Sequence, residues 1–201
     1  MEFAILSRSI LLAVLALPLL GAAPAFKPLT CASPVQKGDT AASLKKRYGA
    51  NARTMRLHVA EGEMATGMAL WPKDPKRRVE VFFEDRPTKR VATVRIDRRG
   101  SLWRLGGVGV GSRLADVVLV NGGPVNVGGF GWDYGGGVDA RGGKLARWPG
   151  GCRIGLVMDV GPEVSRAPDG VFGDGVQLGS DSAILQKAKP RVTKVFLSWR
   201  Y

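Results

Sequence analysis

The chain has 201 residues, and its 30 Lys and Arg outnumber its 17 Asp and Glu to give a formal net charge of +13. Hydrophobic residues make up 45%, which excludes a disordered chain, because that much apolar surface offsets the entropy lost when the backbone is ordered. Two cysteines exclude zinc-ribbon and disulfide-knot scaffolds, and the length suits one or two small domains.

Residues 1–25 are predicted to be a signal peptide. Arg8 gives a positive start, and the apolar run at 10–20 is too short to span a membrane as a helix. Alanines at 23 and 25 suit cleavage before Phe26. We therefore expect a periplasmic or secreted protein with no transmembrane segment. The leader carries one Arg and one Glu, so cleavage leaves the net charge unchanged.

Residues 26–34 are expected to form an N-terminal tail that carries Cys31. In an oxidising compartment, Cys31 and Cys152 are expected to form a disulfide. Two free thiols, or a bridge between two molecules, are the alternatives. A catalytic thiol is disfavoured, because no sequence cue links the single histidine, His58, to either cysteine.

A repeat with an offset of 73 residues organises the rest of the chain. Its matched pairs are Val35/Val108, Gly38/Gly111, Ala42/Ala115 and Gly49/Gly122. Asp39 and Ser112 are expected to cap two short helices, because their side-chain oxygens accept from free N–H groups of a first turn. Glycines suit the positive φ at a helix end, so the helices are expected to stop at Gly49 and Gly122.

Alternating apolar residues after the first helix predict four strands. Their apolar members are Met55, Leu57 and Val59, then Met68 and Leu70, then Val79, Val81 and Phe83, then Ala92, Val94 and Ile96. This pattern is typical of an antiparallel meander with one apolar face, which the helix is expected to cover. Residues 35–99 are therefore predicted to form a first, basic helix-plus-meander unit.

Residues 100–201 are predicted to form a second, Gly-rich unit of the same kind. Its strands are expected within 125–134, 136–140, 154–160 and 195–199, with a long loop at 161–189. Of the 28 glycines, 23 lie between residues 100 and 179, and glycine weakens a strand signal. The predicted fold class is α+β, as two tandem units that each pack a short helix on an antiparallel β-meander.

This doubled pattern, a Gly-[Asp/Ser] start and a short helix ending in Gly before a meander, resembles the β-lactamase-inhibitor-protein architecture. The Val-x-x-Gly openings at Val35 and Val108 are similar to the single module of small outer-membrane assembly lipoproteins of the SmpA/OmlA type. The resemblance covers residues 35–97 and 105–201, and it implies an architecture without a shared partner. The chain departs from the lipoproteins in lacking a lipobox, and from the inhibitors in its basicity and its two cysteines. Residues 130–136 also resemble segments of exported bacterial proteins of unassigned function.

No set of residues in the sequence specifies catalysis, a metal site or a cofactor. His58 alternates with Arg56 away from the apolar side chains of its strand, so it is predicted to be solvent-exposed. One histidine does not make an ordinary zinc site. The glycines at 107–111 lack the long strand and helix of a dinucleotide-binding unit. We expect neither a metal nor a cofactor.

The most distinctive stretch contains Phe130, Trp132, Asp133 and Tyr134 among glycines. The aromatic residues are candidates for stacking on a sugar or anchoring a protein, with Asp133 accepting hydrogen bonds. The alternative is that the aromatic residues pack on the helix while Asp133 caps a turn. A glycan-directed enzyme would pair Asp133 with a second carboxylate. Candidates for that second acid are Asp139, Asp159 and Glu163.

Positive charge gathers in the first unit, since residues 37–104 carry a net +9 and residues 105–201 a net +3. The candidate binding residues at its turns are Lys76, Arg77, Arg78, Lys89, Arg90, Arg98 and Arg99. They predict either a surface for a polyanion or a solvated face. After export, an anionic envelope polymer or an acidic protein is the expected partner, and nucleic acid is disfavoured.

These features favour an exported, non-catalytic binding or inhibitor-like protein that recognises an envelope macromolecule. The hypothesis depends on the repeat, on the basic first unit and on the lack of a convergent catalytic set. Two alternatives stay open. One is a glycan-directed enzyme that uses Asp133 with an aromatic platform, and the other is a structural envelope protein.

Overall fold

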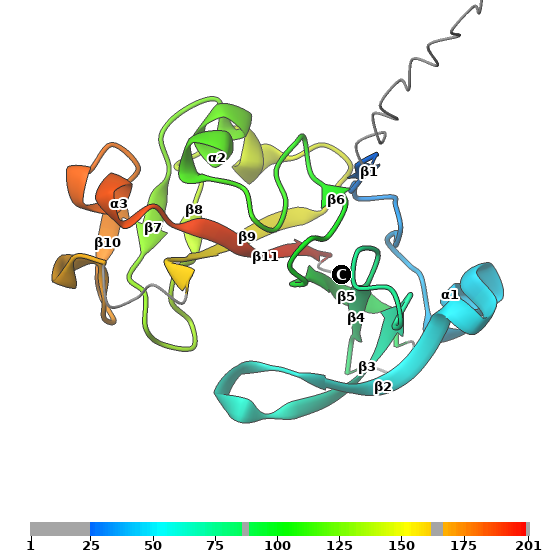
Figure 1. The fold of residues 1–201 in the computed structure, drawn as a ribbon. Helices are drawn as coiled ribbons and strands as arrows, with labels where there is room; N and C mark the ends of the chain where they lie inside the picture. The colour runs from blue at the N-terminus through cyan, green and yellow to red at the C-terminus, as the bar shows by residue number, and fades with distance from the viewer. Residues whose placement is uncertain (1–24, 86–88, 162–166, 200–201) are drawn as a thin grey trace, which may run out of the picture.

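One six-stranded antiparallel sheet extends through the protein in a computed structural model that describes residues 25–85, 89–161 and 167–199 (Figure 1). The strand order is β2-β3-β4-β5-β11-β9, so strands from both predicted units share the sheet. The α+β class is confirmed. The strands are β2 (Ala52–His58), β3 (Met64–Leu70), β4 (Val79–Phe83), β5 (Val91–Ile96), β9 (Arg153–Asp159) and β11 (Arg191–Ser198). The predicted leader lies outside the described residues, apart from its last residue.

Cross-strand pairing defines a buried face of this sheet. Met68 pairs with Val81, Val81 with Val94, and Val94 with Leu197. Directly paired residues point to the same face, so these side chains form a continuous apolar row. All of them are buried in one cluster with side chains of the helices α1 (Ala41–Tyr48) and α2 (Leu114–Asn121). The predicted four-stranded meander is confirmed, and this face is its covered face.

Strand β2 presents its apolar side chains to the opposite face. Met55 pairs with Gly67, whereas Met68 pairs with Thr54. The predicted covered apolar face is therefore wrong for β2. Leu57 is still buried, and a Cβ on Gly67 would lie 2.6 Å from its Cδ1. The face that the helices leave uncovered thus has apolar groups of its own at the β2–β3 hairpin.

Both predicted helices are confirmed, with their N-caps one residue later than expected. Thr40 caps α1, because its hydroxyl accepts from the N–H of Ser43 at 3.2 Å, and residue 113 occupies the cap position of α2. Asp39 is instead buried, and it accepts two hydrogen bonds from Arg47, at 2.8 and 2.7 Å. The ion pair therefore fixes the chain segment that enters α1.

The two helices have the same relation to their glycines. Gly38 and Gly111 precede them with φ of +86° and +93°, and Gly49 and Gly122 end them with φ of +53° and +74°. These positive values favour glycine, because a Cβ is strained there. Both ends of α2 lie 73 residues after the corresponding ends of α1.

The second half of the chain differs from the predicted meander. Only β9 and β11 join the main sheet, while β7 (Asn126–Gly128), β8 (Val138–Asp139) and β10 (Gln177–Gly179) form a separate three-stranded sheet. The strand expected over 125–134 ends early, because the N–H groups of Gly129 and Phe130 donate to the backbone of residues 176 and 171 instead. The expected loop at 161–189 contains β10 and a third helix, α3 (Ala183–Ala188). The short 3-10 helices are η1 (Gly49–Asn51), η2 (Ala60–Gly62), η3 (Lys144–Arg147) and η5 (Asp169–Val171).

The N-terminal segment is packed against the second half of the chain. Its strand β1 (Lys27–Pro28) pairs in parallel with β6 (Trp103–Arg104). Cys31 is buried and forms the predicted disulfide with Cys152, next to the start of β9. Residues 26–34 are therefore an ordered part of the fold. Within the described residues, no helix has the length and hydrophobicity needed to cross a membrane.

Removing the disulfide is expected to lower the free energy of unfolding by about 4 to 5 kcal/mol in the chain-entropy model, because it closes a loop of 121 residues. Urea unfolding of the wild type and of the double variant Cys31→Ser/Cys152→Ser, each with and without reductant, measures this. The double variant should not respond to reductant. An equal midpoint for reduced and oxidised wild type, with reduction verified by thiol titration, would contradict the prediction.

Candidate functional site

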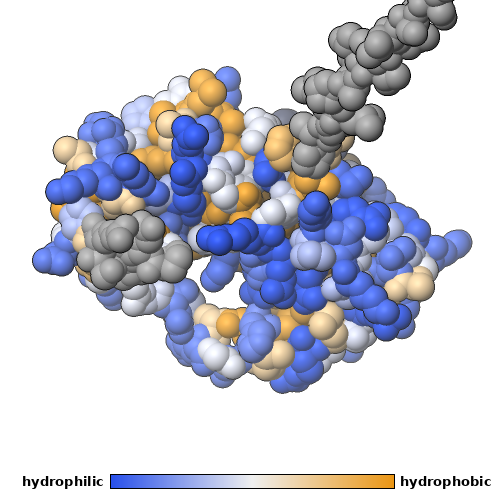
Figure 2. Space-filling view, viewed as in Figure 1, coloured by the Kyte–Doolittle hydropathy of each residue, from blue (hydrophilic) through white to orange (hydrophobic). Residues whose placement is uncertain are grey.

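A hollow of about 530 Å³ lies on the uncovered face of the main sheet. Side chains of β4, β5, β9 and β11 form its floor, and they are Phe82, Thr93, Arg95, Val157, Lys194 and Phe196. Its walls are the tip of the β2–β3 hairpin, residues 59–62, and part of a loop that we call the aromatic loop, residues 129–136. Figure 1 shows the hairpin curving beneath the sheet, and the surface is hollowed above it in Figure 2.

Two glycines let the aromatic loop lie against its neighbours. A Cβ on Gly136 would lie 1.8 Å from the carbonyl oxygen of Met158 in β9, and one on Gly129 would lie 2.3 Å from that of Gly173. Gly136 also has a φ of +72° and accepts a hydrogen bond from the N–H of Met158. Any larger residue at 136 would push the loop away from β9. The glycines of this stretch therefore have a positional role.

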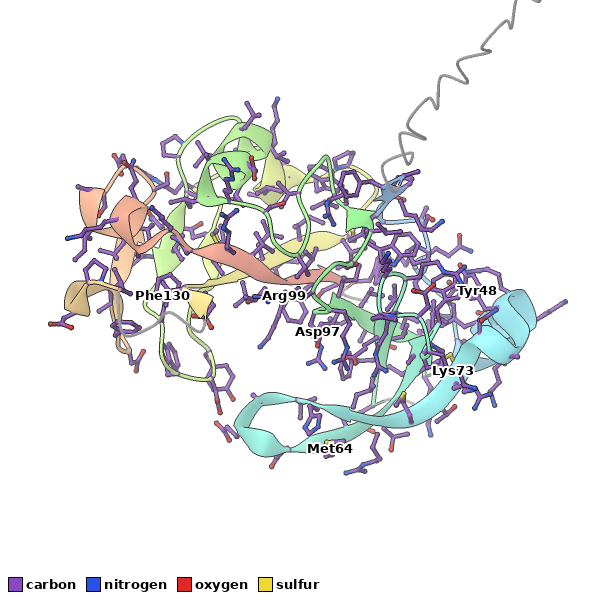
Figure 3. The ribbon with its side chains drawn as sticks, viewed as in Figure 1. Tyr48, Met64, Lys73, Asp97, Arg99 and Phe130 are labelled. Carbon is purple, nitrogen blue, oxygen red and sulfur yellow. A yellow bond between two sulfur atoms is a disulfide. The ribbon has the colours of Figure 1, made fainter. Side chains whose placement is uncertain are left out.

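The aromatic residues of this loop divide between core and surface. Phe130 is buried next to the small sheet (Figure 3), which is the burial that the packing alternative predicted for all three aromatic residues against the helix. Trp132 and Tyr134 are 41% and 59% exposed, with ring centroids 5.7 Å apart in an edge-to-face arrangement. The Trp132 indole donates to the carbonyl of Gly129 at 3.1 Å. Two aromatic rings are thus held at the surface, and Tyr134 lines the hollow.

Asp133 and Tyr134 bind the hairpin tip through Glu61, and we call these three residues the clasp. The Glu61 N–H donates to Asp133 Oδ2 at 3.0 Å, and the Tyr134 hydroxyl donates to Glu61 Oε1 at 3.1 Å. The hydrogen bond to the Glu61 carboxylate raises the pKa of Tyr134, so the hydroxyl keeps its proton. Glu61 has a φ of +56°, which costs a non-glycine residue about 1 to 2 kcal/mol. The clasp stabilises that conformation.

Three arginines converge on one buried carboxylate beside the hollow. Arg78 Nη2 lies 2.8 Å from Glu80 Oε1, Arg95 Nε lies 2.9 Å from Oε2, and Arg98 Nη2 lies 3.7 Å from Oε1. Arg95 also donates to the backbone carbonyl of His58 at 2.7 Å, and its guanidinium lies 5.0 Å from the ring centroid of Phe82. Arg95 is therefore fixed in position at the floor.

The ionisation of Glu80 is set by two opposing effects. Burial acts to raise its pKa, but the hydrogen bonds from Arg78 and Arg95 outweigh burial and hold the pKa below its usual value. Asp97 adds a second carboxylate, 3.3 Å from Arg95 Nε. Three arginines against two carboxylates leave an excess of one positive charge in this cluster.

Lys194 supplies a further positive charge to the floor. It pairs with Val157 of β9 and lines the hollow with Phe196, two residues later on β11. Phe196 itself pairs with Arg95 across the β5–β11 contact. Among the ion pairs formed by the described residues, none involves Lys194. Its ammonium group thus brings to the hollow a positive charge that is not ion-paired.

The other predicted basic residues do not line the hollow. Arg77 pairs with Asp74 at 2.6 Å, beside the exposed Lys76, and the exposed Lys89 and Arg90 lie where β5 begins. A different hollow of about 770 Å³ is lined by Arg99, whose place is marked in Figure 3, together with two carboxylates and two lysines. Arg78 and Arg98 contact Glu80 and do not line the hollow. The seven candidates therefore occupy several separate places on the protein.

The carboxylate residue that lies beside Asp133 is Glu61, which was not among the candidates from the sequence. Asp139 accepts the N–H of Arg141 in its own turn, and Asp159 accepts the N–H of its own neighbour, Val160. Neither lines the hollow, and Glu163 lies outside the described residues. Glu61 takes this position. No group of three or more His, Cys, Asp or Glu in the described parts of the chain is arranged to hold a metal ion. His58 is exposed, as predicted.

Sequence reasoning also missed Phe82, Lys194 and Phe196. A signal for two of them exists, because Phe82 follows the buried Val81, and Phe196 stands between the buried Val195 and Leu197. Apolar residues on both faces of a strand are typical of strands that are covered on both sides. Comparisons with protein families, with curated proteins and with solved structures found no match to this chain.

Glu80→Gln is expected to destabilise the protein by about 3 to 5 kcal/mol at neutral pH, because Arg78 and Arg95 lose a buried charge partner. The pKa of Glu80 is lower in the folded protein, so its contribution to stability is present above the unfolded pKa and is lost as the pH falls through the folded value. The difference in free energy of unfolding between wild type and Glu80→Gln should therefore become smaller at acid pH. Urea unfolding at neutral and acid pH measures it, with the exposed Glu63→Gln as control, and a gap independent of pH would contradict the assignment.

Asp133→Ala is expected to open the clasp. The Glu61 amide loses its acceptor, so its hydrogen exchange should become at least about fivefold faster, since a hydrogen bond of this kind contributes about 1 kcal/mol or more. Asp139→Ala is the matched control, because it removes an equivalent acceptor for a backbone N–H in another turn. If both variants leave the exchange of the Glu61 amide unchanged, the clasp does not hold the hairpin in solution.

Proposed function

We propose that this is an exported, non-catalytic binding protein that holds an anionic polymer of the cell envelope in the hollow. The observation that carries the proposal is the composition of the floor, where Lys194 and Arg95 lie among Phe82, Phe196 and Val157. Cations bind carboxylate or phosphate groups, and aromatic rings pack against the apolar faces of sugar rings. An anionic polysaccharide presents both kinds of group.

The arrangement of charge within the hollow supports an oriented ligand. Its cations lie on the floor, while its carboxylates, Glu61 and Asp133, lie at the clasp. A polyanion would therefore contact the floor and be kept from the clasp by repulsion. The clasp joins the two walls of the hollow through its hydrogen bonds.

The roles of the two carboxylates favour binding over catalysis. Asp133 accepts the N–H of Glu61, and Glu61 accepts the Tyr134 hydroxyl, so each acid already has a structural hydrogen bond. A glycan-directed enzyme needs one acid to protonate the leaving group and the other to act as base or nucleophile. The same two residues are the pair that such an enzyme would use, so a separate assay for new reducing ends tests for cleavage.

Tandem organisation and export belong to the same proposal. The equal offset between the ends of α1 and α2, and the positive φ of the matched glycines, support an origin of the two halves by duplication.

The disulfide between Cys31 and Cys152 supports an oxidising compartment, because structural disulfides persist there. N-terminal sequencing of the secreted protein should find Phe26 as the first residue.

The proposal predicts binding of an oligogalacturonate, as a probe anionic polysaccharide, that weakens as salt increases. Lys194→Gln and Phe196→Ala should each weaken binding about five- to tenfold, because each removes a floor contact of about 1 kcal/mol. Lys73→Gln is the matched control, since Lys73 is an exposed cation outside the hollow, marked in Figure 3. Titration calorimetry measures all three.

Several outcomes would overturn the proposal. Equal losses for Lys194→Gln and Lys73→Gln would mean that the polymer is held by general charge and not by the hollow. Tighter binding of polyglutamate than of the oligogalacturonate would assign the hollow to an acidic protein. Release of new reducing ends, abolished by Asp133→Asn, would make the protein an enzyme.

A further inference from the structure

A third concave surface, which we call the groove, lies between α2 and α3 and shares no residue with the hollow. Two of its residues, Lys189 and Arg191, also line the hollow of about 770 Å³ beside Arg99. Its volume is about 820 Å³, and its apolar lining is Leu114, Ala115, Val118, Leu119, Pro124 and Pro190. Leu119 is 78% exposed and belongs to this contiguous apolar lining, and contiguous exposed apolar patches mark ligand-binding grooves or interaction sites. Hydrophobic surface gathers over α2 in Figure 2, beside hydrophilic side chains.

One end of the groove is strongly positive. Arg113 and Arg191 face each other across an antiparallel bridge, and Lys189 lies two residues before Arg191. Like charges directly opposite one another are destabilising. Among the ion pairs of the described residues, none involves these three cations. The groove has one acidic lining residue, Asp181, next to α3.

Charge and hydrophobicity are separated along the length of the groove. Arg113 is the N-cap of α2, and Leu119 lies six residues further along the helix. At a rise of about 1.5 Å per residue, the two lie about 9 Å apart along the axis. A ligand that spans this distance therefore needs an anion at one end and an apolar chain at the other.

We propose that the groove binds a single-chain anionic amphiphile of the fatty-acid class. The carboxylate lies between Arg113 and Arg191, where it relieves their repulsion, and the acyl chain lies along Val118 and Leu119. Binding takes apolar surface of both ligand and groove out of water, which is the main favourable contribution for such ligands. Charge complementarity at one end selects the anion over a neutral amphiphile. This inference does not depend on the function proposed for the hollow.

The test uses dodecanoate, below its micelle-forming concentration, in titration calorimetry with the full secreted protein. Decanoate should bind up to about 15-fold more weakly, because it buries two fewer methylenes at about 0.8 kcal/mol each. Dodecyl maltoside has the same chain on a neutral head group and should also bind more weakly. Acetate provides the head group alone and should give no measurable heat.

Variants locate the site. Arg113→Gln and Arg191→Gln should each weaken dodecanoate binding about five- to tenfold, and Leu119→Gln, at an exposed position, should weaken it without lowering the unfolding midpoint. Arg153→Gln is the matched control, because this exposed cation lies on β9 outside the groove. The proposal is overturned if dodecanoate does not bind, if dodecyl maltoside binds as tightly, or if Arg153→Gln causes the same loss as Arg191→Gln.

Discussion

The pairing of β11 with β5 is the contact on which the rest of the structure depends. It joins the last strand of the chain to a strand about a hundred residues earlier, with Val195 opposite Ile96 and Leu197 opposite Val94 on the buried face. The same register places Phe196 opposite Arg95 on the uncovered face. One set of backbone hydrogen bonds therefore closes the core and assembles the floor of the hollow. A shift of one residue would exchange the two faces and remove both.

The uncovered face of the sheet carries two arginines whose charged groups are largely buried, and burial of an unpaired charge would be strongly unfavourable. Arg78 and Arg95 are largely withdrawn from water, and Glu80 makes this possible by accepting hydrogen bonds from both. A buried ion pair adds little net stability, because desolvation offsets its attraction, but it fixes the positions of its members. Glu80 therefore orients Arg95 over Phe82, and its removal is destabilising because Arg78 and Arg95 would be left buried without a charge partner. The free charge of Lys194 then adds to a surface that is already ordered.

Local patterns allowed α1, α2, the first four strands of the main sheet and the disulfide to be predicted, because spacing and redox compartment are properties that neighbouring residues or composition reveal. The β5–β11 pairing has no such signal, because nothing in the local sequence shows which distant strand will pair with β5. The prediction of a strand through the aromatic loop was wrong for a different reason. The alternation from Phe130 to Tyr134 is strand-like, but Gly131 and Gly136 have φ of +85° and +72°, which interrupts an extended strand, and of the three aromatic residues only Phe130 is buried. Glu61 was missed because its role comes entirely from the loop that reaches it.

A bulge in β11 determines which face its cations take. The pairing with β9 shifts between Val192 and Lys194, so Val192 and Val195 are both buried although three positions separate them. In a regular strand, Val192 and Lys194 would point to the same face, and Lys194 would enter the core or Val192 would be exposed. The extra residue at the bulge changes the alternation there. Lys194 therefore faces the hollow, while Arg191, on the other side of the bulge, lines the groove. One local irregularity thus allows a single strand to supply a cation to each site and still complete the core.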